Sequence, residues 1–513
     1  MKQINSLLSL LCLLCIVITT SCSTSHKKTS EKKPNVIFIL ADDLGYGDVS
    51  CYNENSQITT PNIDQLAAGG VQFTDAHTSS SVCTPTRYGI LTGRYNWRST
   101  LKKGVLDGYS KELILPKTKT IAGFLKENGY TTAGIGKWHL GWDWNNVEAG
   151  KDSIDYSKKV ENSPTSLGFD YFYGFCGSLD MPPYVWIENA MPTMLPSKET
   201  VSKVRQSTWR KGPVSDDFEH QQVLPIITDK AVKYIAENAK NEKPFFLYLP
   251  FSAPHTPILP TKEFAGKSGL DNIYADFVIM VDAMVGKITK SLEEQGIADN
   301  TILVFTSDNG CSPQANYKQL VEKGHDPSYV YRGHKADIFE GGHRVPYIVR
   351  WPQKVKAAKS EQIICTTDFF ASIADAIGVK IDNNVAEDSY SYLPALELPS
   401  KAEKRTSIVH HSMNGSFAYR KGDWKAIFCP GSGGWSAPRP NSKKAKSLPK
   451  FQLYNLKEDI KEENNLQAQY PEIVNQYKKE LTELIVNGRS TQGEKQKNDG
   501  PQRWEQLNWM DEE

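Results

Sequence analysis

The sequence has 513 residues, which is several times the length that one small hydrophobic core needs and enough for two domains. Hydrophobic residues make up 39% and aromatic residues 10% of it, so most of the chain is expected to fold, and a peptide or a disulfide-stapled mini-protein is excluded. The 60 basic and 59 acidic residues give a net charge of +1 at pH 7, which provides no global field for nucleic acid or an anionic membrane surface. Any anion-binding site must therefore be local.

The first 33 residues have the pattern of a targeting segment. Lys2 precedes a short apolar run over residues 7–18, and small residues then precede Cys22. This pattern predicts export, with a signal peptide over 1–21 and a polar tether over 22–33. The Thr-Thr-Ser-Cys ending resembles a relaxed bacterial lipoprotein box, which implies a lipidated Cys22 and a place in the cell envelope, in the periplasm or at the cell surface. The alternative is an ordinary cleaved signal, and nothing later in the chain is apolar for long enough to span a membrane.

Apolar runs rich in β-branched and aromatic residues alternate with helical patterns after the tether. The runs cover residues 36–40, 245–249 and 302–305, with a weaker one at 131–135, and a long helical pattern covers 276–295. Such alternation favours an α/β fold with a large, mostly parallel sheet flanked by helices, over residues 34–400.

The pattern changes over residues 401–513. Residues 416–420 and 424–428 flank Lys421-Gly422-Asp423, which predicts an antiparallel hairpin. Residues 451–454 could add a strand, and 472–486 have helical periodicity. We therefore expect a smaller α+β subdomain built on an antiparallel sheet.

Polar residues follow each predicted strand, at the edge where ligands bind in open α/β sheets. They are Asp42 and Asp43, then Lys137 and His139, then His255, and then Asp308 with Asn309. The acids and the amide offer only oxygen ligands, which suits Ca²⁺ or Mg²⁺ and disfavours zinc. Singly, each residue is more often a turn, a cap or a surface group.

The segment from Ser81 to Arg94 carries the most specific motif. Pro85 suits a helix start, so Cys83 would lie at a helix N-terminus, where backbone N–H groups can meet an anion. Cys83-x-Pro85-x-Arg87, followed by Leu91-Thr-Gly93-Arg94, resembles the signature of the type I sulfatases of the alkaline phosphatase superfamily. Blocks around Asp42, Lys137, His255, Asp308 and Lys335 are similar to that family's other blocks, in the family's order.

This resemblance implies a cofactor set. Cys83 would be oxidised to formylglycine by a separate maturation enzyme, and one Ca²⁺ ion would be held by the residues Asp42, Asp43, Cys83, Asp308 and Asn309. The hydrated aldehyde is a gem-diol, of which one hydroxyl would attack the sulfur of a sulfate monoester.

The resemblance also implies roles for the remaining catalytic residues. Lys137 and Lys335 would neutralise the sulfate oxygens, and Arg87 would orient the diol. His255 would protonate the departing alcohol, and His139 would then take the proton of the second hydroxyl so that sulfate leaves. For the lysines alone, a solvated surface amine is the usual alternative.

The substrate is less visible in the sequence. By analogy we expect an O-sulfated carbohydrate, contacted by residues that lie in loops: Asp180, Trp186, Arg332 and His334. Two alternatives remain: a phosphonate or phosphate ester hydrolase of the same superfamily, and a catalytically silent glycan-binding lipoprotein. The phosphonate and phosphate ester hydrolases tend to have a histidine among their metal ligands, at the place where this sequence has Asn309. A silent glycan-binding lipoprotein would have lost catalytic residues, and none of them is missing here. Contact with nucleic acid is not expected, and contact with a membrane is expected only through the N-terminal lipid.

Overall fold

The computed structural model describes residues 32–398 and 405–511. The predicted signal peptide, Cys22 and the expected boundary at 400/401 lie outside these residues, and every element named below belongs to the compact unit Pro34–Glu513. No helix in the described part of the chain combines the length and the apolar character that crossing a membrane takes.

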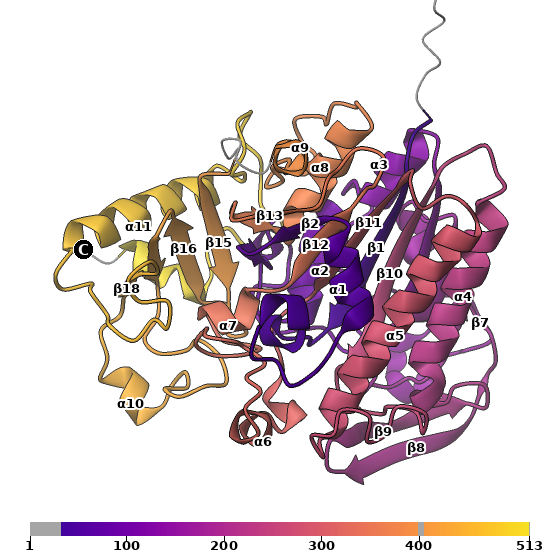
Figure 1. Cartoon of the computed structure of the whole chain (residues 1–513). Helices are drawn as coiled ribbons and strands as arrows, with labels where there is room; N and C mark the ends of the chain where they lie inside the picture. Colours follow the sequence, from indigo (N-terminus) through magenta and orange to yellow (C-terminus); the bar gives the residue numbers. More distant parts are fainter. Residues whose placement is uncertain (1–31, 399–404, 512–513) are drawn as a thin grey trace, which may run out of the picture. The chain divides into compact units, whose positions relative to one another are not determined.

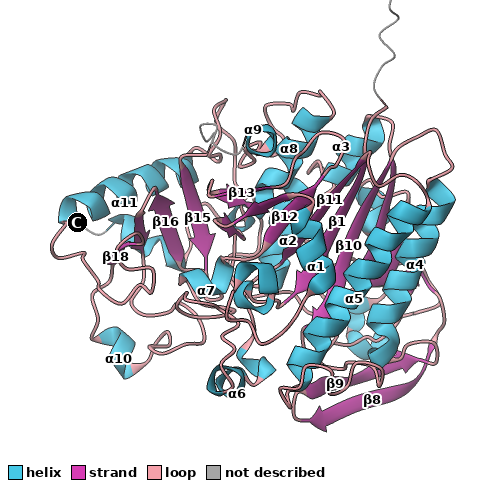
Figure 2. Ribbon diagram, viewed as in Figure 1, coloured by secondary structure: helices cyan, strands magenta, loops and turns pink. Residues whose placement is uncertain are grey.

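A ten-stranded sheet forms the centre of this unit (Figures 1 and 2), with strand order β13-β2-β12-β11-β1-β10-β4-β5-β6-β7. Its strands are β1 (Asn35–Asp42), β2 (Val71–Phe73), β4 (Thr131–Lys137), β5 (Tyr171–Phe175), β6 (Ile187–Glu188), β7 (Met191–Pro192), β10 (Phe245–Pro254), β11 (Thr301–Ser307), β12 (Tyr347–Arg350) and β13 (Ala358–Ser360). All four predicted strands are present, as β1, β4, β10 and β11. These four and β5 run parallel side by side, whereas the pairs toward both edges are mostly antiparallel. The predicted mostly parallel α/β sheet is thus confirmed, with antiparallel additions at its edges.

Strand β1 is apolar throughout because both faces of the sheet are covered. Ile37 and Ile39 pack into one core with helices α1, α4 and α5, and Val36 and Phe38 pack into a second core with α2, α3 and α8. A strand that is buried on both sides needs an uninterrupted apolar run rather than an alternating one. The helices are α1 (Pro61–Ala68), α2 (Cys83–Thr92), α3 (Ile121–Glu127), α4 (Val223–Asn238), α5 (Ile273–Glu294), α6 (Tyr317–Glu322), α7 (Glu340–His343), α8 (Phe369–Ala376), α9 (Leu393–Glu397), α10 (Lys443–Lys446) and α11 (Pro471–Val486).

The C-terminal part has its own antiparallel sheet, formed by β15 (Ser407–His411), β16 (Phe417–Lys421), β17 (Trp424–Ile427) and β18 (Gln452–Asn455). The predicted hairpin is β16–β17, and the predicted helix is α11. One face of this sheet packs against α11, and the other packs against Ile338 and Phe339 of the loop before α7. The second sheet therefore lies against the segment that carries Lys335.

Four further strands lie outside these two sheets, and none of them was predicted. A ribbon of β8 (Pro196–Val204) and β9 (Ser207–Ser215) lies outside the main sheet, and β3 (Ala76–His77) pairs with β14 (Ile364–Cys365). Most residues of β8 are exposed, so the ribbon lacks the apolar alternation that reveals a half-buried strand.

Candidate active site

Four oxygen-bearing side chains meet where the parallel strands β1 and β11 end. Asp42 is the last residue of β1, and the register pairs Ala41 with Ser307, so Asp308 follows at the same edge of the sheet. The Asp43 backbone N–H donates to Asp308 Oδ1 over 3.2 Å, and Asn309 Nδ2 donates to Asp43 Oδ1 over 2.7 Å. All four side chains are fully buried. The edge-of-sheet prediction is confirmed for this set.

Two oxygens of this set accept no hydrogen bond. Asp42 Oδ1 and Asn309 Oδ1 are buried, and neither has a hydrogen-bond donor among the described residues, although Arg87 Nη2 lies 3.6 Å from Asp42 Oδ1. Burial, together with the nearby Asp42 carboxylate, raises the pKa of Asp308 to about 7. Buried oxygens without donors are costly, and a hard cation is the ligand that such a set accepts.

Each carboxylate of the set also faces one basic side chain. Lys137 Nζ is 2.7 Å from Asp42 Oδ2, and Lys335 Nζ is 2.7 Å from Asp43 Oδ1. Arg87 Nη2 is 2.6 Å from Asp308 Oδ2, and Arg87 Nε donates to the same oxygen over 3.0 Å. Three negative and three positive charges balance one another here, so a bound divalent cation would leave two positive charges to attract an anion.

Cys83 is the first residue of α2, as the position of Pro85 predicts. Val82 before it is extended, and Gly93 ends the helix with φ +64, a conformation that glycine adopts without strain. Cys83 is 3% exposed and forms no disulfide, and Arg87 lies one turn further along the helix. Burial raises the pKa of the Cys83 thiol, although Lys137 and Lys335 oppose this. Burial thus favours the neutral thiol over the thiolate.

His139 is held as a neutral ring with one free nitrogen. Its Nε2 lies 2.8 Å from the Leu106 carbonyl, which can only accept, so Nε2 carries the proton. Nδ1 is buried and has no partner in the described part of the chain. Burial and the nearby Lys137 hold the pKa of His139 well below its ordinary value. The bare Nδ1 is thus ready to accept a proton.

His255 has different hydrogen-bond partners from His139. Its Nδ1–H donates to the Thr256 carbonyl, and its Nε2 is 3.6 Å from Asp43 Oδ2 and 3.5 Å from Ser178 Oγ. Burial lowers its pKa, and Lys335 adds to this. Asp42, Asp43 and His255 together form one of two groups of side chains in the described residues that could hold a metal ion.

Three residues in or beside the site have positive φ without being glycine. They are Asp43 (φ 64), His139 (φ 55) and Ala336 (φ 79), the last next to Lys335. Left-handed backbone costs free energy for residues with a Cβ, and it concentrates where side chains must be aimed at a site. The backbone of this region is therefore shaped by the site rather than by the fold alone.

The chain matches the family model described as "Sulfatase" over residues 34–379. It is 34% identical to an N-acetylgalactosamine-6-O-sulfatase of Bacteroides thetaiotaomicron, over 94% of this chain and 99% of that protein. It is 30% identical to human arylsulfatase A, over 77% of this chain and 75% of that protein. A Bacteroides thetaiotaomicron structure, solved in work on the metabolism of multiple glycosaminoglycans, matches with a TM-score of 0.78 and 34% identity, and it covers 88% of this chain and 99% of its own. The chain belongs to the sulfatase family.

Members of this family are sulfuric ester hydrolases, and the predicted enzyme class is confirmed. A phosphonate monoester hydrolase of Agrobacterium radiobacter shares the fold at 18% identity and a TM-score of 0.57. The alkaline phosphatase-like fold expected from the sequence is therefore present, and the fold by itself does not select sulfate over phosphonate.

The four expected substrate contacts of this sulfatase lie in different places. Trp186 is fully buried among aromatic residues of the core, so it has no surface to offer a substrate. Arg332 stacks on Phe339, 3.8 Å from the ring centre, and donates to the Glu462 carbonyl. His334 is next to Lys335 in the chain. Asp180 Oδ2 lies 3.5 Å from Nη2 of the exposed Arg210.

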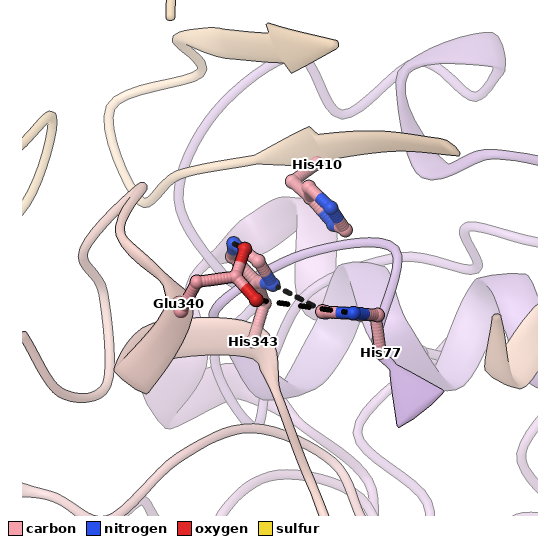
Figure 3. Close-up of side chains that lie close together, drawn as sticks. All are labelled: His77, Glu340, His343 and His410. Atoms are coloured by element: carbon pink, nitrogen blue, oxygen red, sulfur yellow. Dashed lines mark hydrogen bonds and ion pairs between the residues drawn. The ribbon is translucent and has the colours of Figure 1, made fainter. Parts of the chain in front are cut away.

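A second buried group lies outside the active site of the sulfatase, where β15 and β17 meet α7. It consists of His77, Glu340, His343 and His410 (Figure 3), and its residue types could hold a metal ion. The ammonium group of Lys425, also fully buried, lies 3.0 Å from Glu340 Oε1 and 3.1 Å from His343 Nε2. A cation thus already occupies the carboxylate side of this group.

Close polar contacts link this second group to both parts of the chain. His343 Nε2 lies 3.1 Å from Lys425 Nζ, which can only donate, and 3.2 Å from the Ile338 carbonyl, which can only accept. The Nδ1 atoms of His343 and His77 are 3.0 Å apart, and His77 Nε2 lies 2.6 Å from Asp75 Oδ1 and 3.2 Å from Arg420 Nη1. These contacts join the C-terminal sheet to the part that carries the active site.

Ser178 is a site residue that sequence reasoning missed. Its hydroxyl lies 3.2 Å from Lys137 Nζ and 3.4 Å from His255 Nδ1, and it is fully buried. It follows β5 at the edge of the sheet that carries the other site residues. A single serine in a loop gives no signal in the sequence, and only the strand order shows its place.

Proposed function

We propose that this sulfatase hydrolyses a sulfate monoester on a carbohydrate, in a sulfated glycan or glycosaminoglycan fragment. One observation carries the proposal: three basic side chains pair with a buried set of carboxylate and amide oxygens, two of which accept no hydrogen bond. The relative that matches over nearly its full length is named for a sulfated amino sugar, which supports the same substrate class.

The residues fit both groups that the family implies. The oxygen set of Asp42, Asp43, Asp308 and Asn309, with its two oxygens that accept no hydrogen bond, would hold a Ca²⁺ ion. Cys83 lies at the start of α2 and is 3% exposed in the folded protein, so its conversion to formylglycine by a maturation enzyme would precede folding. When present, the ion polarises the sulfate ester and the aldehyde hydrate supplies an oxygen nucleophile.

The protein's own side chains would perform the remaining tasks. Lys137 and Lys335 bind the sulfate oxygens and stabilise the negative charge that develops during reaction. Arg87, held by Asp308 and by the Lys137 carbonyl, fixes the position of residue 83 from the next turn of α2. His255, when it is protonated at Nε2, would give that proton to the departing sugar oxygen, which leaves as the hydroxyl, and His139 would accept a proton at its free Nδ1.

Sulfate release by matured protein tests this proposal. We expect protein whose Cys83 peptide mass shows loss of H₂S and gain of one oxygen to release sulfate from members of a sulfated-sugar panel. Cys83→Ala should abolish release while its melting temperature stays close to that of the parent protein. Faster turnover of a phosphodiester than of any sulfate ester would contradict the proposal, as would binding of sulfated sugars without turnover after confirmed maturation.

We also propose that the protein is exported and anchored through a lipid on Cys22. The support is the pattern of charged, apolar and small residues over 1–22. Radiolabelled palmitate should enter the protein in its bacterial host, and Cys22→Ala should remove the label and move the protein out of the membrane fraction. Labelling that is unchanged in this variant would contradict a lipidated Cys22.

A further inference from the structure

A segment of the C-terminal subdomain reaches the loop that carries the catalytic Lys335. Residues 430–438 follow β17, and within them the Ser432 carbonyl accepts from the Ile338 N–H over 2.8 Å. Gly434 packs so closely that a Cβ there would lie 2.2 Å from the Ala336 carbonyl oxygen. Glycine is required at this contact because any side chain would push the segment away from the lysine loop.

A buried carboxylate fixes this segment in position. Asp337 is fully buried, and its Oδ1 accepts from the backbone N–H groups of Trp435 and Ser436 over 2.8 and 2.9 Å. Its Oδ2 accepts from the His334 N–H over 3.1 Å and from the Ser436 hydroxyl. The same carboxylate thus holds both the lysine loop and residues 435–436, so the side chain of Trp435 has a defined place beside Lys335.

Trp435 presents an aromatic face next to a catalytic cation. Lys335 Nζ lies over its ring, 6.0 Å from the ring centre, while the same Nζ contacts Asp43. Trp435 is half-buried, whereas Trp138 and Trp186 are at most 1% exposed. A partly exposed indole beside a sulfate-binding ammonium group has no role in the core, and neither the fold nor the proposed chemistry uses it.

We propose that Trp435 is the platform of a sugar-binding subsite, against which the pyranose ring of the substrate stacks while its sulfate is held by Lys335 and Lys137. This inference rests on the proposed carbohydrate sulfatase function. Indole faces bind the C–H faces of sugars, and an ester whose sulfate lies at Lys335 brings its sugar within reach of that ring. The C-terminal subdomain would then contribute to substrate recognition, and the catalytic part would contribute the chemistry.

The platform also narrows the substrate class. A galacto-configured sugar, whose axial 4-hydroxyl leaves the hydrogens of C3, C4 and C5 together on one face, presents the broadest C–H surface to such a ring. A gluco-configured sugar with the same sulfate lacks that surface. We therefore expect discrimination between N-acetylgalactosamine 6-sulfate and N-acetylglucosamine 6-sulfate that depends on Trp435.

The test compares binding of the sugar with binding of the sulfate alone. We expect Trp435→Ala to raise KM for N-acetylgalactosamine 6-sulfate about tenfold, the loss of one good aromatic contact. The inhibition constant of inorganic sulfate, which touches only the basic side chains, should change less than about twofold. Trp435→Phe should restore most of the affinity. Trp424→Ala, which truncates a half-buried tryptophan of the same sheet that packs on Tyr470, is the matched control and should leave KM unchanged.

Two outcomes would overturn the subsite. In the first, KM and the sulfate inhibition constant rise equally, which would mean that Trp435 acts by positioning Lys335. In the second, KM and the preference for the galacto sugar are both unchanged, which would mean that Trp435 affects neither Lys335 nor sugar binding. Failure of the proposed function is distinguishable, because matured wild-type protein would then turn over no sulfated sugar at all. In each comparison, the melting temperature of every variant is measured against that of the wild-type protein, so that a loss of folding is recognised.

Discussion

At the scale of single residues, the two active-site histidines differ in the atom that each leaves free. His139 is fixed by the Leu106 carbonyl so that Nδ1 is bare, and His255 is fixed by the Thr256 carbonyl so that Nε2 faces Asp43 and Ser178. Backbone carbonyls accept only, so each one sets the tautomer of its ring. The two carbonyls therefore define the atom through which each ring would exchange a proton in the proposed mechanism.

His139→Gln should separate the two halves of the reaction. Without the base at residue 139, each active site would release about one molecule of alcohol, and the sulfate would stay on the protein. The steady-state rate should therefore fall by about 10²- to 10⁴-fold. Rapid-quench measurement of the alcohol, together with an intact-mass increase equal to one sulfate group, checks this. His220→Gln is the control, because it alters a buried histidine that stacks on Trp209. This variant should turn over substrate continuously. A His139 variant with no initial release of alcohol would show that this residue acts before the first step.

At the scale of elements, Lys425 on β17 joins the C-terminal sheet to α7. Its fully buried ammonium group lies 3.0 Å from Glu340 Oε1 and 2.9 Å from Glu462 Oε1. Removal of one member of a buried ion pair leaves an uncompensated charge, which costs far more than the pair itself contributes. The junction between the two sheets therefore depends on this lysine.

Lys425→Met should lower the free energy of unfolding by about 3–5 kcal/mol, measured in urea. The added change Glu462→Gln should recover part of that loss because it removes a buried charge that has lost its lysine, whereas Glu340 keeps Arg344 Nη1 at 3.1 Å. Lys421→Met, on the neighbouring strand, breaks a partly exposed pair with Glu480 and should cost less than about 1 kcal/mol. Equal effects of the two lysine variants would show that the buried pair does not hold the junction.

At the scale of the whole molecule, the proposed metal ion would join β1 to β11 at the centre of the main sheet. Its ligands come from residues more than 260 positions apart, as the hydrogen bonds from Asp43 to Asp308 and from Asn309 to Asp43 illustrate. An ion that binds only the folded arrangement stabilises the entire unit. Binding of the proposed ion would therefore be coupled to folding.

The melting temperature should rise with free Ca²⁺, with about 2.7 kcal/mol of added stability when the ion is at about one hundred times its Kd. Chelation should remove both this gain and the activity, and Ca²⁺ should restore both better than Zn²⁺, since the ligands are oxygens. Asp308→Asn should weaken the dependence on Ca²⁺ strongly. A wild-type melting temperature that does not change with Ca²⁺ concentration would contradict the proposed site.

The sequence by itself determined four central strands of the main sheet, β1, β4, β10 and β11, and the edge at which the candidate site residues gather. Uninterrupted apolar runs mark strands that are buried on both faces, and the residues after them, such as Asp42 and Asp308, must meet because parallel strands end at one edge. The motif around Cys83 also fixed the start of α2. These features are local in the chain, so their signals survive without tertiary information.

Only the tertiary structure decided which remaining residues join the site. Trp186 is of a residue type that often contacts sugars, but it is fully buried. Ser178 and Trp435 have no sequence feature that marks them as site residues, yet they lie beside Lys137 and Lys335. The edge strands of the main sheet, the ribbon of β8 and β9 and the meeting of Lys425 with Glu340 were equally invisible. Exposure and long-range contact depend on how distant segments pack, and no periodicity in one segment records the position of another.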